Sequence, residues 1–341
     1  MKLKEILKYI FSFFLAGALL WYVLKGQDLG DIKHTILNSH WQWLFVSASF
    51  ALFSHYIRGL RWGLMLKPLN LKTSPSNLFM ATMSGYAGNT VLPRFGEFFR
   101  CGILQKLSGI PAKTSFGAVL IERAVDMIVF IVLFGIAFLS QFDRLYEMVT
   151  PHIDAQGEAM ERRFLLLGFL AFGLIVTCVL LYLVRERLMK TPLFRKIQTM
   201  FMGVYDGMRA VLKLERKEFY IYIAYTALIW VSYFFMSYVV FFVLDDTSHL
   251  SIGVGFVMMM MSGLGMVIPT PGGTGSVHFF ATQTLIAYGI AEAEASSYAL
   301  IMHTSQTILV LVVGGISTLI ANHKEGHSQE EHINQEDALK K

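Results

Sequence analysis

Long apolar runs separated by short polar and basic segments dominate the pattern of this chain. Six of these runs have about the 20 residues that an α-helix needs to cross the hydrocarbon core of a bilayer. They lie at roughly 8–24, 41–64, 115–140, 164–184, 218–243 and 296–320. We interpret all six as full transmembrane helices, so the pattern predicts an all-α polytopic membrane protein.

The basic residues between these runs predict the orientation of the helices. With a cytosolic N-terminus, most of the 29 lysines and arginines fall on the cytosolic side, including Arg58, Arg61 and a dense group at 185–217. Cytosolic loops of membrane proteins carry such an excess. We therefore expect both termini to be cytosolic, in a cell inner membrane. The first run also resembles a signal peptide, but no small-residue cleavage site follows it, so we expect an uncleaved helix.

Two further apolar runs, at 77–93 and 251–269, do not fit this count. Each ends at a proline and is followed by a second short arm. Counting either arm as a full span would place basic loops on the wrong side. We therefore expect two re-entrant hairpins, each of which enters the membrane halfway and returns to the side it came from. Irregular backbone at that depth is tolerated only where protein or a water-filled cavity surrounds it.

The two hairpins also resemble each other in sequence. MSG at 83–85 recurs at 261–263, and VLPRFG at 91–96 is similar to VIPTPG at 267–272. Since each hairpin lies between two spans, the pattern predicts two repeats of opposite topology, at about 41–140 and 218–320. Inverted repeats are typical of transporters whose site lies near the membrane midplane. The alternative is a chance similarity between two apolar segments that contain glycine and proline.

The segment VIPTPGGTGSV marks the tip of the second hairpin. Its two prolines would end the first arm because proline cannot donate a backbone hydrogen bond, and its three glycines permit a tight reversal. The second arm would then direct the free N–H groups of its N-terminus towards the middle of the membrane. The first hairpin would present a second helix N-terminus at 94–96. Both tips are therefore expected to face one region.

Ionisable residues stand inside the predicted membrane region, where each costs at least ~2.5–3.5 kcal/mol. The segment IERAVD places Glu122, Arg123 and Asp126 well inside a span, and the segment 94–100 carries two arginines and a glutamate three residues apart. These charges either pair to lock the first hairpin to the span, or they bind a substrate or a coupling ion. Arginine suits phosphate or carboxylate because its guanidinium donates two parallel hydrogen bonds.

The second repeat is poor in charge, since Glu122 aligns there with His303. We therefore expect charge recognition to lie mainly in the first repeat. His303 and His278 could titrate near neutral pH, or they could be packed, hydrogen-bonded histidines. Four consecutive methionines at 258–261 are interpreted as packing, because their side chains point in all directions around a helix.

Composition agrees with a membrane protein, because 55% of the 341 residues are hydrophobic and only 16% are charged. The net charge of +5 follows from orientation, and no nucleic-acid-binding module is visible, so we expect no nucleic acid partner. Cys101 and Cys178 imply neither a disulfide framework nor a metal site. We expect no cofactor. Without a GK[ST] phosphate loop the chain would not hydrolyse nucleotide itself.

Two segments outside the spans have their own character. The stretch 194–211 has apolar residues at steps of three and four with a basic face, which favours a helix lying on the anionic cytosolic leaflet or against a partner. The polar segment 323–341 is expected to be a disordered cytosolic tail. The rest, 1–322, is interpreted as one transmembrane domain.

Three stretches, NTVLPRFGEFFR, IERAVD and IPTPGGTG, resemble the transmembrane region of the lysylphosphatidylglycerol synthase and flippase-like family, which is also described as an uncharacterised inner-membrane family. The resemblance covers about 5–320. It implies movement of aminoacylated phospholipid between leaflets, with relatives in glycolipid or isoprenoid-phosphate pathways. With the tip residues and the second repeat included, the candidate substrate-binding positions are Arg94, Gly96, Glu97, Arg100, Glu122, Arg123, Asp126, Pro269, Pro271, Gly272, Gly273, Gly275 and His303.

These observations together predict a transporter that binds a membrane lipid with an anionic or zwitterionic headgroup and flips it between leaflets. The lipid would be aminoacylated, glycosylated or an isoprenoid phosphate. Two alternatives stay open: a membrane partner of a separate lipid synthase or glycosyltransferase, and a lipid-headgroup aminoacyltransferase. The family name implies the latter activity, but the sequence stops soon after the last span, so we expect no soluble catalytic domain and no enzyme.

Overall fold

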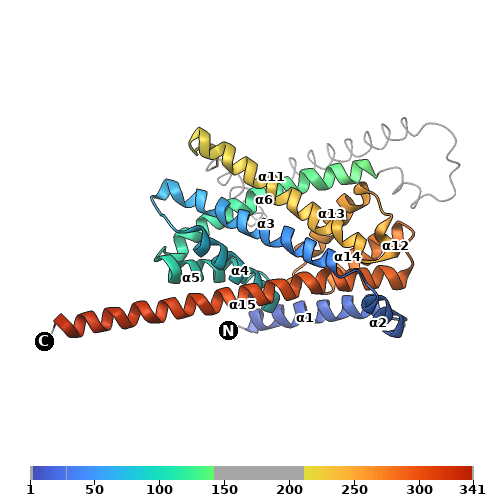
Figure 1. Cartoon of the computed structure of the whole chain (residues 1–341), viewed down its shortest axis with the longest axis horizontal. Coiled ribbons are helices and arrows are strands. Elements are labelled where there is room, and N and C mark those ends of the chain that lie inside the picture. The colour runs from blue at the N-terminus through green and yellow to red at the C-terminus, as the bar shows by residue number, and fades with distance from the viewer. Residues whose placement is uncertain (1–2, 28, 142–210, 340–341) are drawn as a thin grey trace, which may run out of the picture.

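The computed structural model describes residues 3–27, 29–141 and 211–339, with the side chains of 3–9, 29, 31 and 325–339 excepted (Figure 1). In this part of the chain all regular structure is helical. The first half contains α1 (Leu3–Leu24), α2 (Leu29–Leu37), α3 (Gln42–Leu66), the 3-10 turn η1 (Lys67–Leu69), α4 (Pro75–Val91), α5 (Gly96–Ser108) and α6 (Ala112–Ser140).

The second half has a long helix, a four-residue helix, two short helices and a long helix. It contains α11 (Arg216–Tyr238), which continues as the 3-10 segment η2 (Val239–Val243), then α12 (Asp245–Ser248), α13 (Ile252–Val267), η3 (Pro271–Gly273), α14 (Ser276–Ala287) and α15 (Glu292–Leu339). The predicted span at 164–184, most of the segment 194–211 and Cys178 lie outside the described residues. The all-helical fold is confirmed.

Two helical segments among the described residues are long and apolar enough to cross a membrane: Arg216–Val243 and Glu292–Lys324. Helices α3 and α6 have 25 and 29 residues, but ionisable side chains interrupt their apolar surface. The other predicted spans and the re-entrant character of the short-helix pairs stay predictions. Helix α15 continues to Leu339, where we expected a disordered tail. That segment contains no proline and many Glu, Gln and Lys residues, which are good helix formers.

The first short-helix pair is broken where the sequence predicts. Ser74 caps α4 by accepting a hydrogen bond from the backbone N–H of Asn77, at 3.2 Å. Leu92 is extended, as expected for a residue before proline, and Arg94 adopts a left-handed φ of 63°. A Cβ added at Gly96 would collide with the carbonyl oxygen of Gly85. Glycine at these two positions therefore lets α4 and α5 pack backbone to backbone.

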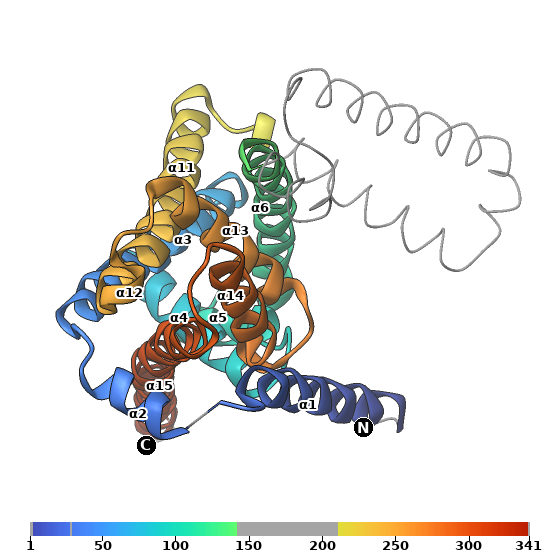
Figure 2. The same cartoon turned by 90° about the vertical axis from the view of Figure 1, so that its right-hand side faces the viewer.

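The second pair reverses in the way its prolines and glycines predict. Helix α13 ends at Val267, and α14 begins at Ser276 after a turn in which all three glycines of the tip have positive φ. An added Cβ at Gly265 would lie 2.8 Å from Cα of Val277, so α13 and α14 also pack closely. In Figure 1, α4–α5 lie to the left of α13–α14 along the long axis, and Figure 2 shows the protein from its right-hand side.

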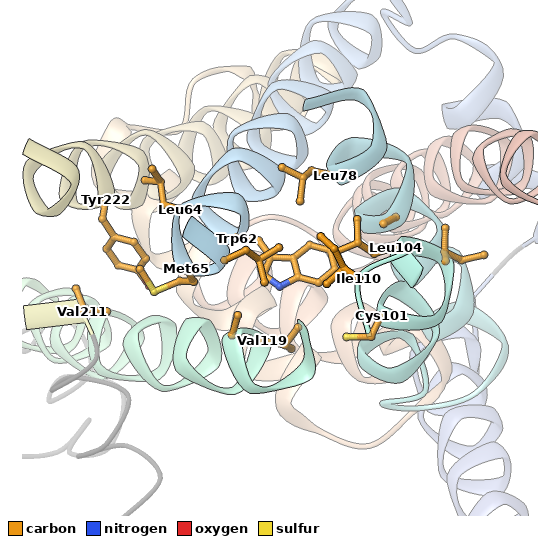
Figure 3. Packing of buried hydrophobic residues seen from close by; sticks show 14 of the residues in the cluster. Trp62, Leu64, Met65, Leu78, Cys101, Leu104, Ile110, Val119, Val211 and Tyr222 are labelled. Carbon is orange, nitrogen blue, oxygen red and sulfur yellow. The ribbon is translucent and has the colours of Figure 1, made fainter. Parts of the chain in front are cut away.

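Each short-helix pair contributes to its own hydrophobic core. The first core surrounds Trp62 of α3 and combines Leu78 of α4, Leu104 of α5 and Val119 of α6 (Figure 3). The indole N–H of Trp62 donates to the carbonyl oxygen of Ser115, at 3.2 Å. The second core forms from the beginning of α13, one face of α14, the beginning of α15 and η2.

The turn of the second short-helix pair packs on the end of α4, close to the turn of the first pair. We define the first tip as residues 92–95, which join α4 to α5, and the second tip as residues 268–275, which join α13 to α14. The second tip packs on the end of α4, since an added Cβ at Gly272 would lie 3.2 Å from Cα of Thr90. Helix α1 covers the other side, because a Cβ at Gly275 would collide with the carbonyl oxygen of Ala16.

Candidate functional site

Five ionisable side chains form a buried network, which we call the charge network. Arg58 and Arg61 come from α3, Arg100 from α5, and Glu122 and Asp126 from α6. The spacings of three residues on α3 and four on α6 place each pair on one helix face, so the two faces can meet. The side chains are at most 12% exposed, and Glu122 is completely buried.

The Glu122 carboxylate accepts hydrogen bonds from all three arginines. The Nη2 of Arg100 donates to Oε2 at 2.8 Å, while Arg58 Nη1 and Arg61 Nη2 donate to Oε1 at 2.9 and 3.3 Å. Asp126 accepts from Arg61 Nη2 at 2.7 Å and from Arg58 Nη1 at 2.8 Å. Each carboxylate therefore bridges at least two guanidinium groups and ties α3 to α6.

Helix α11 completes the surroundings of the charge network. The Tyr233 hydroxyl accepts a hydrogen bond from Arg58 Nη2, and the Thr226 hydroxyl accepts one from Arg61 Nη1, both at 3.0 Å. On the other side, the guanidinium of Arg100 stacks over the Trp62 ring, 4.6 Å from its centroid. The network thus joins α3, α5 and α6 of the first half to α11 of the second.

The charges of the network do not balance. Three guanidinium groups face two carboxylates, so one positive charge is left over. The Nε atoms of all three arginines are buried and have no hydrogen-bond partner within the protein. A buried charge without a counter-ion is costly. The arrangement therefore favours the approach of an anion.

Next to the network lies an accessible ion pair, which we call the outer pair. The Nη2 of Arg123 on α6 lies 2.8 Å from Oε1 of Glu97 on α5, and their side chains are 44% and 20% exposed. Arg123 directly follows Glu122 in sequence. The second carboxylate oxygen of Glu97 is buried and has no hydrogen-bond partner within the protein. A ligand can reach the outer pair through the exposed guanidinium of Arg123, whereas the charge network is covered by protein.

The second tip holds a smaller polar group. The backbone N–H of Gly275 donates to Nδ1 of His278 at 3.2 Å, and His303 Nε2 lies 2.9 Å from the carbonyl oxygen of Gly272. The two imidazole rings contact each other edge to face, with centroids 4.6 Å apart. The hydroxyls of Thr270 and Ser276 are 2.8 Å apart and stabilise the same turn.

The structure separates residues that the sequence predicted in one cluster. Arg100, Glu122 and Asp126 lie together in the charge network, and Arg123 and Glu97 form the outer pair. Arg94 joins neither group: it is exposed at the first tip, and none of the described side chains forms an ion pair with it. The six ionisable residues that the sequence singled out therefore do not form one cluster, since Arg94, whose backbone has a left-handed φ, lies apart from the other five.

The helix N-termini at the tips are also less open than expected. The N–H of Gly96 donates to Oδ1 of Asn89 at 2.7 Å, and the N–H of Gly275 donates to His278. Side chains of the protein therefore occupy one donor at each tip. At the second tip Pro271 and Gly273 are buried, whereas Pro269 is exposed. Among the described contacts, none joins these residues to the charge network.

Sequence reasoning missed Arg58 and Arg61, which it counted as loop charges that set orientation. Both lie within the predicted span 41–64, and their spacing of three residues is a signal of one charged helix face. The rule that singled out Glu122 applies equally to them, since an ionisable residue inside a span is costly wherever it stands. Both lie near the end of the span that was predicted to be cytosolic, which favoured the topological interpretation.

A groove of about 400 Å³ lies outside the first core, between α5 and α15. Its lining is mostly apolar and consists of Phe95, Phe98, Phe99, Gly102, Ile103, Lys106, Thr318 and Asn322. The volume is within the ~300–1,000 Å³ typical of ligand pockets. Phe98 follows Glu97 of the outer pair, so an apolar surface adjoins the accessible charges. The part of the chain that the structure describes contains no cluster of three potential metal ligands of the His, Cys, Asp or Glu type.

Comparison with known protein families shows which family the chain belongs to. The model of the lysylphosphatidylglycerol synthase TM region matches residues 9–314, which include both tips, the charge network and the outer pair. The chain belongs to this family. The resemblance seen in its three motifs is thereby confirmed. Membership of the lysylphosphatidylglycerol synthase TM region family shows that the chain is a membrane protein. No curated protein and no solved structure matches the chain.

Proposed function

We propose that this membrane protein binds a lipid with an anionic, phosphate-containing headgroup and moves it between leaflets. The observation that carries the proposal is the charge network with one more guanidinium than carboxylate. A lipid phosphate bound at the outer pair, whose Arg123 directly follows Glu122, would place a negative charge next to this surplus. Its family, described as a lysylphosphatidylglycerol synthase TM region, supports a lipid as the ligand.

The outer pair is the part of this region that a headgroup can touch directly. Arg123 and Glu97 are partly exposed, and an exposed ion pair is worth only ~0–1 kcal/mol, so a phosphate can replace the carboxylate on Arg123 at little cost. Phosphate accepts two parallel hydrogen bonds from a guanidinium. The displaced Glu97 is then available to an ammonium group, as in an aminoacylated headgroup.

The apolar part of the lipid would use the groove between α5 and α15. Three phenylalanines line it, and the first of them, Phe95, follows Arg94 directly. An anionic headgroup at the first tip would therefore leave its chains beside aromatic walls. Arg94 is exposed there and can serve as a second phosphate contact without disturbing the charge network.

Movement across the membrane would require the second tip to separate from the end of α4. Gly272 of the second tip packs on Thr90 of α4, two residues before the first tip begins, and the two tips are the points where both short-helix pairs interrupt their helices. We infer that a headgroup passes between them while the charge network keeps α3, α5 and α6 together. The network would thus hold the fixed part of the site, and the two short-helix pairs would supply its alternating exposure.

The proposal can be tested by mass spectrometry of the lipids that stay bound to purified protein. Arg123→Gln should lose a phosphate-containing lipid that the wild type retains. The matched control is Lys67→Gln, because Lys67 forms an ion pair of similar exposure with Glu218, at 55% and 18%, away from the site. The control should keep the lipid. Equal lipid profiles in all three proteins would contradict the proposal. Stable co-purification of a synthase would then favour the partner-subunit alternative.

A further inference from the structure

The paired histidines at the second tip are not part of the proposed lipid-binding site. Both side chains are largely buried. His278 lies on α14 and His303 on α15, and each is bonded to the backbone of the turn between them. They therefore connect two separate helices to the segment that packs on the end of α4.

The hydrogen bond of His278 fixes which of its nitrogens carries the proton. A backbone N–H can only donate, so Nδ1 of His278 must accept from Gly275 and must be unprotonated. The neutral ring therefore has its proton on Nε2. A proton from solvent would bind to Nδ1, and two donors would then face each other at 3.2 Å. The bond that holds the beginning of α14 to the turn would be lost.

His303 behaves in the opposite way. Its Nε2 lies beside a carbonyl oxygen, which can only accept, so Nε2 carries a proton in the neutral ring and donates to Gly272. Protonation of the other nitrogen, Nδ1, leaves this bond in place and makes it a charge-assisted one. The two rings thus have different roles. Protonation breaks the hydrogen bond between His278 and Gly275, whereas it preserves the hydrogen bond between His303 and Gly272.

No other ionisable side chain of the described residues offers a counter-charge to these rings. Helix α13 and η3 carry none, and α4 has only Tyr86, whose ring packs on His55. On α1, Tyr22 packs on a phenylalanine of α14, and the charged residues near its start precede Ala16 by about 12 Å of helix or more. On α15, Tyr298 donates to a backbone carbonyl, and the charged residues stand more than two turns from His303.

A proton on this pair would therefore be an uncompensated buried charge. Such a charge costs several kcal/mol unless water or a counter-ion reaches it. The turn is tightly enclosed, because a Cβ at Gly275 would collide with α1 and one at Gly272 would press on Thr90. Water reaches the rings when the second tip moves away from α1 or from the end of α4. Protonation and this movement are therefore linked.

We propose that His278 is a proton-binding site whose occupation releases the second tip from its contact with the end of α4. If the protein moves a lipid as proposed above, this site couples that movement to protons; the opening itself is independent of the lipid. Histidine suits the role because its ordinary pKa of about 6.5 lets modest changes in pH alter its charge. The carboxylates of the charge network have no part in it.

The opening can be measured as the reaction of a buried thiol with a water-soluble maleimide. Thr270→Cys places the thiol in the second tip, where the native side chain is 4% exposed, in a protein whose Cys101 and Cys178 are replaced by alanine. The rate is divided by that of Asp246→Cys, an exposed position, which corrects for thiol ionisation. Purified protein in lipid nanodiscs should label about tenfold faster at about pH 5.5 than at about pH 8 after this correction.

Two substitutions separate the histidines. His278→Asn keeps an acceptor near the place of Nδ1 but cannot titrate, so its tip should stay closed at both pH values. His303→Gln keeps a donor near the place of Nε2, so it should retain the pH response. A corrected rate that does not change with pH in the parent protein, or that changes equally in His278→Asn, would overturn the proposal.

A second measurement covers the case in which the cysteine variant does not fold. Hydrogen–deuterium exchange of the peptide around 268–280 in the otherwise unchanged protein should increase at low pH, after correction for the intrinsic rate, and His278→Asn should abolish the increase. An unchanged exchange rate overturns the proposal. Since neither readout depends on a lipid, a pH-independent tip combined with specific lipid loss in Arg123→Gln would refute the proton site and leave the proposed lipid function standing.

Discussion

Replacing Glu122 by glutamine should destabilise the protein far more than replacing its neighbour Arg123. Glu122 is fully buried and accepts hydrogen bonds from three arginines. The neutral glutamine leaves Asp126 as the single carboxylate for three guanidinium groups. Its amide also brings an N–H donor next to groups that can only donate. Removing one member of a buried ion pair costs about 3–5 kcal/mol. Thermal unfolding in detergent should show a fall in Tm of about 5–10 °C.

Arg123→Gln should leave the stability almost unchanged. Its side chain is 44% exposed, and such a pair contributes about 0–1 kcal/mol, so the Tm should fall by no more than about 2 °C. Loss of a bound lipid in this variant could then be assigned to recognition. A large loss of stability would instead show that Arg123 is part of the scaffold, and it would remove the distinction between the outer pair and the charge network.

A double variant tests whether the stability of the network depends on its charge balance. Arg100→Gln combined with Glu122→Gln removes both partners of the 2.8 Å pair and restores the original surplus of one positive charge. The double variant should be more stable than the sum of the single effects predicts, by a coupling energy of about 0.5–3 kcal/mol. Strictly additive effects would refute the reasoning, because they would mean that the two groups do not interact.

Three further predictions concern the frame around the site. Gly96→Ala should lower the Tm, because its methyl group would collide with α4. Gly102→Ala on the same helix has open space around the added methyl group and should leave the Tm unchanged. Equal effects of the two substitutions would contradict the close packing of α4 and α5. Cysteines at Asp246 and Arg209 should react with impermeant reagents from opposite sides of the membrane, and reaction from one side would refute the predicted topology. Arg94→Ala should leave the Tm unchanged because Arg94 is exposed, and it should reduce bound lipid in the mass spectra; full retention would exclude Arg94 from the site.

The sequence predicted the helical fold and the breaks in the short-helix pairs because these depend on local chemistry. Proline excludes the helix from the residue before it, and the glycines of the second tip adopt the positive φ that other residues avoid. The acidic pair on α6 could be found for a similar reason, since a spacing of four residues places both carboxylates on one helix face.

Partners across the fold were harder to predict. Arg58 and Arg61 reach Glu122 over more than 60 positions, and nothing in one sequence shows which helix faces which. Arg94 was expected among the charges by its spacing of three from Glu97, but α5 begins only at Gly96. A helical spacing rule does not extend beyond the end of the helix. The hydrogen bond from the Gly275 N–H to His278 depends on the geometry of the turn, so the sequence alone did not predict it.

The most direct test of the account is the transfer of a fluorescent phosphatidylglycerol between the leaflets of liposomes that contain the purified protein. A quencher added outside reports how fast labelled lipid reaches the outer leaflet. The account predicts that wild-type protein and Lys67→Gln accelerate transfer over empty liposomes, and that Arg123→Gln does not. The proposed function would be contradicted if Arg123→Gln accelerated lipid transfer as much as the wild type does. It would also be contradicted if the wild type accelerated the transfer of no phospholipid, glycosylated lipid or isoprenoid phosphate tested.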